Sequence, residues 1–323
     1  MLRKALGIAA LIVVAQALLV AFFAWPAATA GPHDVPVVVA GPAPAAGALA
    51  DRLRAARPGA FRVSTVADGA AADARLRDRR AYAAIVVGPT GPSVHVATAA
   101  SPAVAQLFTQ LAATLGPTPA PVVDVVPAGP EDPRGAGFVS GFLPLLITGI
   151  AVGALLTLTV RSRAGRLAGV VGYAAGSGLL SAAVGQYWSG TLAGSYPANA
   201  AALGLLSLAV AGTVTGLASL LGIRGVGVGA LLVFVVGNPL SGLASAPELL
   251  PTPWGRIGQA LPPGAGATLL RSTSFFDGAG SAAPAAVLAA WAVIGVALLV
   301  LARTPGQVEP APAPELAGAT TSG

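Results

Sequence analysis

Few residues of this 323-residue chain could carry out chemistry. A nucleotide-hydrolysing P-loop needs a lysine that contacts the transferred phosphates, and the only lysine is Lys4, close to the N-terminus. Thiol catalysis and thiolate metal sites need cysteine, which the chain lacks. His33 and His95 have no further metal ligands at suitable spacing, and no Gly-x-Ser-x-Gly elbow is combined with His and Asp. We therefore expect no catalytic residue, no cofactor, no metal site and no enzymatic activity.

Ion or proton relays inside a membrane usually depend on ionisable side chains within the spans. Residues 138–160, 167–221 and 225–247 contain no Asp, Glu, Lys, Arg or His, which argues against a proton-coupled carrier. Uncharged polar side chains remain there. They either line a path or hydrogen-bond between helices and to their own backbone, and the second alternative is favoured. These residues are Thr157, Thr159, Ser177, Ser181, Gln186, Ser207, Thr213, Thr215 and Asn238.

The elements that carry these residues are predicted by composition. Hydrophobic residues make up 55% of the chain and charged residues 9%, whereas soluble domains are about a quarter charged. Each uncharged stretch is long enough for the roughly 20 residues that cross a bilayer. We therefore predict an α-helical polytopic membrane protein with six transmembrane helices and the lipid bilayer as its surroundings. The predicted spans are 5–25, 138–160, 167–188, 199–221, 225–246 and 282–302.

The distribution of charge predicts the orientation of the chain. The net charge is +6, but residues 31–137 hold nine arginines against eight acids, so nucleic-acid binding is not expected. Most of the excess lies at the ends of apolar segments, as the positive-inside rule describes. Those residues are Arg3, Lys4, Arg161, Arg163, Arg166, Arg224 and Arg303. We predict a multi-pass protein of the cell membrane with both termini cytoplasmic.

The chain is predicted to have four parts. Residues 1–30 form an N-terminal anchor, which is favoured over a cleaved signal peptide because the apolar run exceeds 7–15 residues. Residues 31–137 form a small extracytoplasmic α/β domain and linker, inserted between helices 1 and 2. Residues 138–302 form a five-helix transmembrane domain, and 303–323 form a disordered cytoplasmic tail.

The α/β prediction for residues 31–137 rests on the alternation of β-branched runs with Ala/Arg/Asp-rich stretches. The order of the elements, βαβαββαβ, predicts a mixed sheet. The strands are predicted at 35–40, 62–66, 82–87, 93–98 and 121–126, and the helices at 45–56, 70–80 and 101–115, the last capped by Ser101.

The most distinctive region is 237–277. Gly237-Asn238-Pro239-Leu240-Ser241-Gly242 interrupts the fifth span, and freed carbonyls there need partners inside the protein or a cavity. The segment 247–281 either forms short re-entrant-like helices at the outer membrane face or is an ordinary loop. The candidates for functional geometry are Asn238, Pro239, Trp254 and Arg271. Their alternative roles are helix breaking, interface anchoring and lipid-headgroup contact.

Small residues at four-residue spacing predict close helix packing. Four such Gly-x-x-x-Gly pairs occur in the predicted spans, at Gly149/Gly153, Gly172/Gly176, Gly212/Gly216 and Gly225/Gly229.

The order of the predicted parts, one anchor, a translocated domain and then five spans, resembles that of ABC-2-type membrane proteins. Three short sequence segments also resemble one branch of these proteins, the phage infection protein family and related actinobacterial permease proteins. Asp78-Arg79-Arg80-Ala81-Tyr82 through Val86 is similar to the helix-to-strand step of the ectodomain in that branch. Gly237–Gly242 with Pro247–Pro251 is similar to its break after the fifth span. Leu261-Pro262-Pro263 through Arg271 is similar to its outer re-entrant segment.

This resemblance implies a permease-like component of an export or envelope-assembly system, without ATPase activity of its own. It also implies a separate ATPase subunit, which would dock on Arg161, Arg163 and Arg166, and a homodimer. The alternative is a non-transporting membrane scaffold or sensor that acts through its extracytoplasmic domain.

Overall fold

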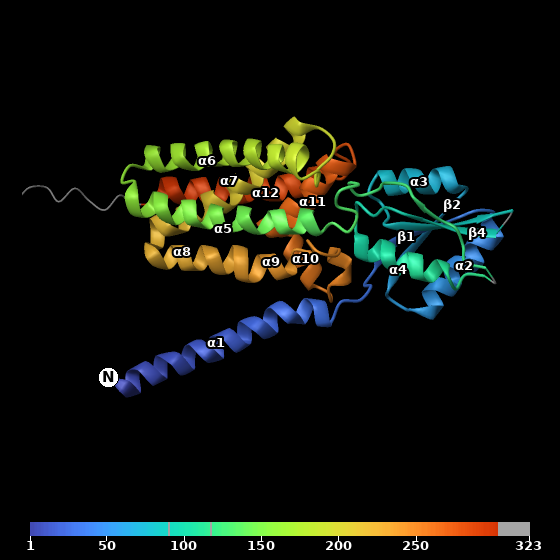
Figure 1. Ribbon diagram of the computed structural model, residues 1–323, viewed down its shortest axis with the longest axis horizontal. Coiled ribbons are helices and arrows are strands. Elements are labelled where there is room, and N and C mark those ends of the chain that lie inside the picture. The colour runs from blue at the N-terminus through green and yellow to red at the C-terminus, as the bar shows by residue number, and fades with distance from the viewer. Residues whose placement is uncertain (90, 117, 303–323) are drawn as a thin grey trace, which may run out of the picture.

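The computed structural model describes residues 1–89, 91–116 and 118–302. The predicted tail, 303–323, lies outside the described residues, and so does Arg303. A helical bundle occupies one end of the molecule and a small α/β domain the other, with the first helix running obliquely beside the bundle (Figure 1). Six helices are long and apolar enough to cross a membrane, so the predicted membrane class is confirmed at that level.

The α/β domain follows the predicted order of elements closely. Its strands are β1 Val35–Ala40, β2 Phe61–Val66, β3 Ala83–Gly88, β4 Gly91–Val96 and β5 Val122–Asp124. Its helices are α2 Ala43–Ala56, α3 Gly69–Arg77 and α4 Pro102–Ala112. The predicted cap of α4 is present, because the hydroxyl of Ser101 accepts a hydrogen bond from the amide of Val104.

The sheet is mixed, as predicted, with the order β2-β1-β3-β4-β5. β1 is parallel to β2 and β3, while β4 is antiparallel to β3 and parallel to β5. Alternate residues of β1 point to opposite faces. Val37 packs with Phe108 of α4, whereas Val38 packs with Leu76 of α3. The sheet therefore lies between α3 on one face and α2 and α4 on the other (Figure 1).

The bundle surrounds one central helix. In α7, Tyr196–Leu221, 72% of the most apolar 18-residue stretch is buried, whereas the buried share is at most 28% in the other candidate spans of the described chain. α5, α6, α8, α11 and α12 all contact it. The other spans are α1 Leu2–Ala28, α5 Ala136–Thr159, α6 Arg163–Ala183 continued by a π-helical turn Val184–Trp188, α8 Ile223–Ala230 continued to Leu240, and α12 Ala282–Leu301.

The fifth span is irregular, as its sequence indicated. α8 passes into a π-helical segment, Leu231–Gly237, and then into the short α9, Asn238–Leu240. Pro239 has no amide hydrogen to donate, which suits a position where the regular helical ladder is already disturbed. Three further short helices precede the sixth span: a 3-10 turn Pro247–Leu249, α10 Trp254–Gln259 and α11 Pro262–Phe275. The segment 247–281 therefore contains short helices between residues 247 and 275, whereas residues 276–281 are not helical.

Three of the four glycine pairs pack as predicted. A Cβ at Gly153 would lie 2.7 Å from Cβ of Val214 on α7, and one at Gly229 would lie 2.9 Å from the same side chain. A Cβ at Gly216 would collide with the carbonyl of Gly295 on α12. Gly172 and Gly176 are different, because nothing lies within 4 Å of a Cβ at either one. This pair faces outward from the bundle and makes no close helix contact.

The polar side chains within the spans are mostly satisfied inside the bundle, which is the alternative that the sequence favoured. Thr157 and Thr215 donate to the carbonyls of Gly153 and Ala211, each four residues earlier. Ser177 of α6 and Ser207 of α7 are hydrogen-bonded at 2.9 Å. These groups stabilise helices and helix pairs.

Successive spans run in alternating directions through the bundle. Four helix ends lie at the end of the bundle away from the α/β domain (Figure 1). These are the start of α1 and the C-terminal ends of α5, α7 and α12. The aromatic rings of Trp25 and Trp254 lie together at the opposite end, with centroids 5.9 Å apart.

Candidate functional site

The segment between the fifth and sixth spans forms the floor of the site. Proline stands at the first turn of two of its helices, Pro247–Leu249 and α11, where its fixed φ and missing amide hydrogen are tolerated. Gly258 lets α10 approach the end of the fifth span, because a Cβ there would collide with the carbonyl of Leu240. In α11, 11 of the 14 residues are buried. The chain thus turns back into the bundle before the sixth span begins.

The α/β domain contributes the turn between α3 and β3. Arg79 has a left-handed φ of 57°. The amides of Arg79 and Arg80 donate to the carbonyls of Leu76 and Arg75, which is the hydrogen-bond pattern of a Schellman motif. Because of this turn, α3 ends at Arg77 and not at the predicted Arg80. The chain then enters β3, and Tyr82 is the residue immediately before that strand.

Two backbone hydrogen bonds attach the domain to the segment between the fifth and sixth spans. The amide of His33 donates to the carbonyl of Glu248 at 2.8 Å, and that of Gly31 to Leu249 at 3.0 Å. Nearby, the phenol of Tyr82 donates to the carboxylate of Glu248 at 2.8 Å. Burial raises the pKa of this phenol, and the adjacent carboxylate raises it further, so Tyr82 stays neutral.

Arg79 makes the second connection between domain and bundle. Its guanidinium NH1 donates to the carbonyl of Thr268 at 2.7 Å and to the hydroxyl of Ser272, both in α11. The guanidinium also lies 5.2 Å from the centroid of the Phe276 ring. Burial lowers the pKa of Arg79, while Tyr82 and Glu248 partly oppose this.

Arg271 lies deeper, within α11, and its residue surface is only 7% exposed. Its NH2 group donates to the carbonyl of Leu243 at 2.6 Å, and its guanidinium lies 4.8 Å from the centroid of Phe138. Burial, and secondly the charge of Arg79, lower the pKa of Arg271 to about 10. It therefore remains protonated at neutral pH.

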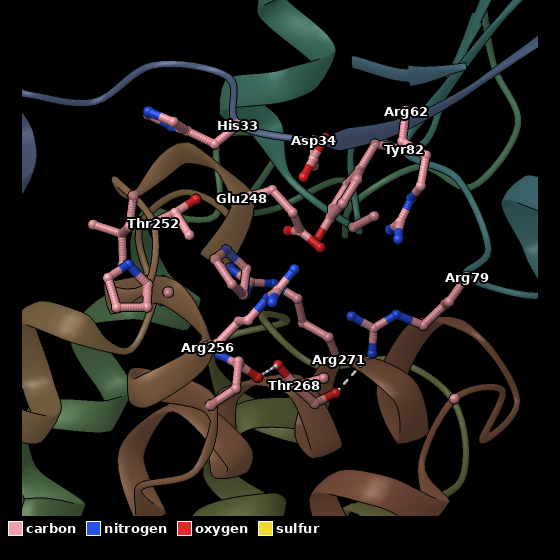
Figure 2. A pocket seen from close by; sticks show the side chains of 17 residues that line it. His33, Asp34, Arg62, Arg79, Tyr82, Glu248, Thr252, Arg256, Thr268 and Arg271 are labelled. Carbon is pink, nitrogen blue, oxygen red and sulfur yellow. Dashed lines mark hydrogen bonds between the residues drawn. The ribbon is translucent and has the colours of Figure 1, made fainter. Parts of the chain in front are cut away.

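These groups surround a cavity of about 450 Å³ between the α/β domain and the bundle (Figure 2). Four arginines and two carboxylates line it, so its charge is positive. Figure 2 shows Tyr82 and Glu248 meeting inside this space, with Arg79 entering from one side. The charged and aromatic lining residues are His33, Asp34, Arg62, Arg79, Tyr82, Glu248, Arg256 and Arg271.

The structure treats the four candidates of the 237–277 region differently. Arg271 lines the cavity, and Trp254 lies between two lining residues, Pro253 and Gly255, while packing on Trp25. Asn238 and Pro239 do not line it. The carbonyl of Asn238 accepts hydrogen bonds from the amide and hydroxyl of Ser241, a local role in the turn after the fifth span.

Sequence reasoning did not single out the other charged residues of the cavity. Arg79 and Tyr82 stood in a patch that carried the family resemblance. Their partners, Thr268 in α11 and Glu248 in the turn Pro247–Leu249, lie 189 and 166 positions away in the sequence. The unusual left-handed turn at Arg79 has no glycine to indicate it. The Pro-Glu-Leu-Leu-Pro run around Glu248 was the one available signal.

The three candidate docking arginines lie at the other end of the bundle. Arg161 and Arg163 are exposed, whereas Arg166 is half-buried. The guanidinium of Arg166 donates to the carbonyls of Val160 and Thr157 and to the hydroxyl of Ser219. Arg166 thus joins the end of α5 to α7, and only the other two present their charge freely.

The α/β domain also contains a serine, a histidine and an aspartate in contact. His95 Nδ1 lies 2.6 Å from Oδ1 of Asp73, and His95 Nε2 lies 3.2 Å from the hydroxyl of Ser93. This order of groups occurs in hydrolases. None of the three lines the cavity between domain and bundle, and the network links β4 to α3. In the described part of the chain, no group of three or more His, Cys, Asp or Glu side chains could hold a metal ion.

Fold and site together define a multi-pass membrane protein that carries a small mixed α/β domain over a basic cavity. Comparisons with family models, with curated proteins and with solved structures find no match for this chain.

Proposed function

We propose that this chain is the membrane-spanning, permease-like component of an ABC-2-type export or envelope-assembly system. A separate subunit would supply ATP hydrolysis, and two copies of the chain would assemble side by side. The proposal places the protein in the cell membrane with the α/β domain outside and both termini in the cytoplasm.

The observation that carries this proposal is the return of the chain into the bundle between the fifth and sixth spans. α11 is buried against α7 and α12, and α10 leads into it from the end of the bundle next to the α/β domain. Irregular backbone at membrane depth is tolerated where it is buried in protein or lines a cavity. A single anchor, a domain and five spans with this re-entrant segment is the layout that the family resemblance implies.

The first span supports assembly with a partner. None of the most apolar 18-residue stretch of α1 is buried. Among the described residues, the helix touches the bundle near its C-terminal end, where the ring centroids of Phe23 and Phe234 are 6.1 Å apart. In lipid this exposed apolar surface is stable, and it also leaves room for a second copy to pack between α1 and the bundle.

An ATPase partner would have to bind at the end of the bundle that carries Arg161 and Arg163. The connections there are short, with residues 160–162 between α5 and α6 and only Gly222 between α7 and α8. This observation favours the alternative, a non-transporting scaffold or sensor that acts through the α/β domain. The two readings differ in one testable property, stable association with an ATPase.

The test is affinity purification of the tagged chain from native membranes, followed by mass spectrometry of the proteins that co-purify. A stoichiometric ATPase that is lost in the Arg161→Glu, Arg163→Glu double variant is the expected result. The matched control is Arg75→Glu with Arg77→Glu, two exposed arginines of the α/β domain. If only envelope proteins co-purify in several detergents, the scaffold alternative replaces the permease proposal.

A further inference from the structure

We infer that the cavity between the α/β domain and the bundle binds the anionic, phosphate-bearing headgroup of a membrane amphiphile. The inference goes beyond the proposed function and does not depend on an ATPase partner, because it concerns the opposite end of the bundle. It is based on the arginine side chains that line the cavity, on their lack of carboxylate partners and on their unused hydrogen-bond donors.

The positive charge of the cavity is not neutralised within the protein. Among the described residues, no carboxylate oxygen lies within 4.0 Å of a guanidinium nitrogen of Arg79 or Arg271. Glu248 instead accepts its hydrogen bond from the neutral phenol of Tyr82. Buried charges are costly unless they are paired, and here two buried or half-buried cations lie close enough to influence each other. A bound anion would offset that cost.

Arg79 and Arg271 also have hydrogen-bond donors that no described residue uses. Arg271 uses only NH2, and Arg79 uses only NH1, for hydrogen bonds to described residues. Each keeps its Nε and one terminal nitrogen for another acceptor, although Arg271 is only 7% exposed. A guanidinium presents such paired donors in a fork that matches the oxygens of a phosphate. Cations that approach from both the domain and α11 suit a tetrahedral group better than a flat carboxylate.

The mouth of the cavity adds two more cations, since Arg62 and Arg256 line it and are exposed. Its volume of about 450 Å³ falls within the range of about 300–1,000 Å³ for small-molecule sites, and it exceeds what one phosphate would occupy. The adjoining Trp25–Trp254 pair marks this level as the membrane interface, where aromatic belts form. A headgroup can therefore enter the cavity while its hydrocarbon chains stay in the bilayer.

The test uses the full-length chain, purified in mild detergent, and native mass spectrometry. Three probes are added separately: phosphatidylglycerol, phosphatidylcholine and inorganic phosphate. Phosphatidylglycerol carries a net negative charge, whereas phosphatidylcholine has matched chains and no net charge. We expect saturable binding of one phosphatidylglycerol, weaker binding of phosphatidylcholine, and no displacement of the lipid by millimolar inorganic phosphate.

Variants assign the binding to the cavity. Arg271→Gln and Arg79→Gln should each weaken phosphatidylglycerol binding roughly 10-fold or more, since hydrogen bonds to charged groups are among the stronger ones. The control, Arg75→Gln, removes the same charge from an exposed position outside the cavity and should change nothing. Size-exclusion profiles report whether each variant remains folded.

A second variant avoids the buried residues. Arg62→Gln combined with Arg256→Gln changes only the mouth and should weaken binding roughly threefold. Unchanged affinity in this double variant, or equal affinity for the two lipids, would overturn the proposal. Displacement of the lipid by inorganic phosphate would overturn the amphiphile as the source of the phosphate group.

Discussion

The phenol of Tyr82 donates a 2.8 Å hydrogen bond to the carboxylate of Glu248, across 166 positions of sequence. The bond joins the residue before β3 to the turn that leads into α10 and α11. Both backbone hydrogen bonds from residues 31 and 33 reach the same turn, at Leu249 and Glu248. The α/β domain is thus attached to the segment between the fifth and sixth spans, and a movement of one would be transmitted to the other.

Removing this phenol is the most direct test of that attachment. Tyr82→Phe leaves the Glu248 carboxylate without its hydrogen-bond donor, and hydrogen bonds to charged groups contribute about 1.5–3 kcal/mol. We expect a lower unfolding temperature in detergent and faster proteolysis between the domain and the first span. The control is Tyr173→Phe, whose phenol bonds Thr148 within the bundle and is exposed. Equal effects of the two changes would contradict a special role of Tyr82.

The same residue predicts a dependence on alkaline pH. The pKa of Tyr82 is raised in the folded protein, whereas an unfolded tyrosine titrates near 10. Because the folded value lies above the unfolded one, the contribution is complete below pH 10 and is lost as pH rises beyond it. The stability difference between wild type and Tyr82→Phe should therefore narrow from pH 8 to pH 11. Thermal unfolding of both proteins across this range measures it, and a constant difference would refute the assignment.

The elements of this fold could be predicted because their signals are local. The alternation of Val37 and Val38 between two buried faces follows from the two-residue period of a strand, and β1 begins and ends where it was predicted. The hydroxyl of Ser101 indicated the start of α4 for a similar reason. Long uncharged runs likewise marked the spans, with ends displaced by a few residues.

The site could be predicted only in part. Arg271 could be predicted as a candidate because it is one of the sparse charges in a segment of apolar residues and prolines, but its neighbour Arg79 belongs to the α/β domain. Nothing in the local sequence states that Arg79 would donate to Thr268, since that contact depends on how the domain docks. Asn238 and Pro239 drew attention as helix breakers, and the structure gives them a place in the irregular fifth span rather than in the cavity.

The glycine pairs allow a matched test of packing in the bundle. A Cβ at Gly153 would lie 2.7 Å from Val214, so Gly153→Ala should destabilise the bundle by about 1–3 kcal/mol through overpacking. Gly176→Ala meets nothing within 4 Å and should be neutral or slightly stabilising, because alanine favours helix. Unfolding temperatures of the two variants in one detergent provide the comparison. A larger loss at Gly176 than at Gly153 would mean that its outward face is covered, for instance by a second copy.

Arg166 provides the last test, because the structure separates it from the two arginines beside it. Its guanidinium forms no ion pair with a carboxylate among the described residues and instead donates to the free carbonyls at the end of α5, where a cation is favourable. It also holds Ser219 of α7 at 2.9 Å. Arg166→Gln should therefore lower the stability of the bundle by about 1–3 kcal/mol, whereas Arg163→Gln, at an exposed position, should have little effect.

Association with an ATPase should respond in the opposite way. It should weaken in Arg163→Gln, and it should persist in the folded fraction of Arg166→Gln. Measured together, unfolding temperature and co-purification distinguish a residue that holds two helices from one that contacts a partner, and a loss of association without a loss of stability in Arg166→Gln would assign it to docking after all.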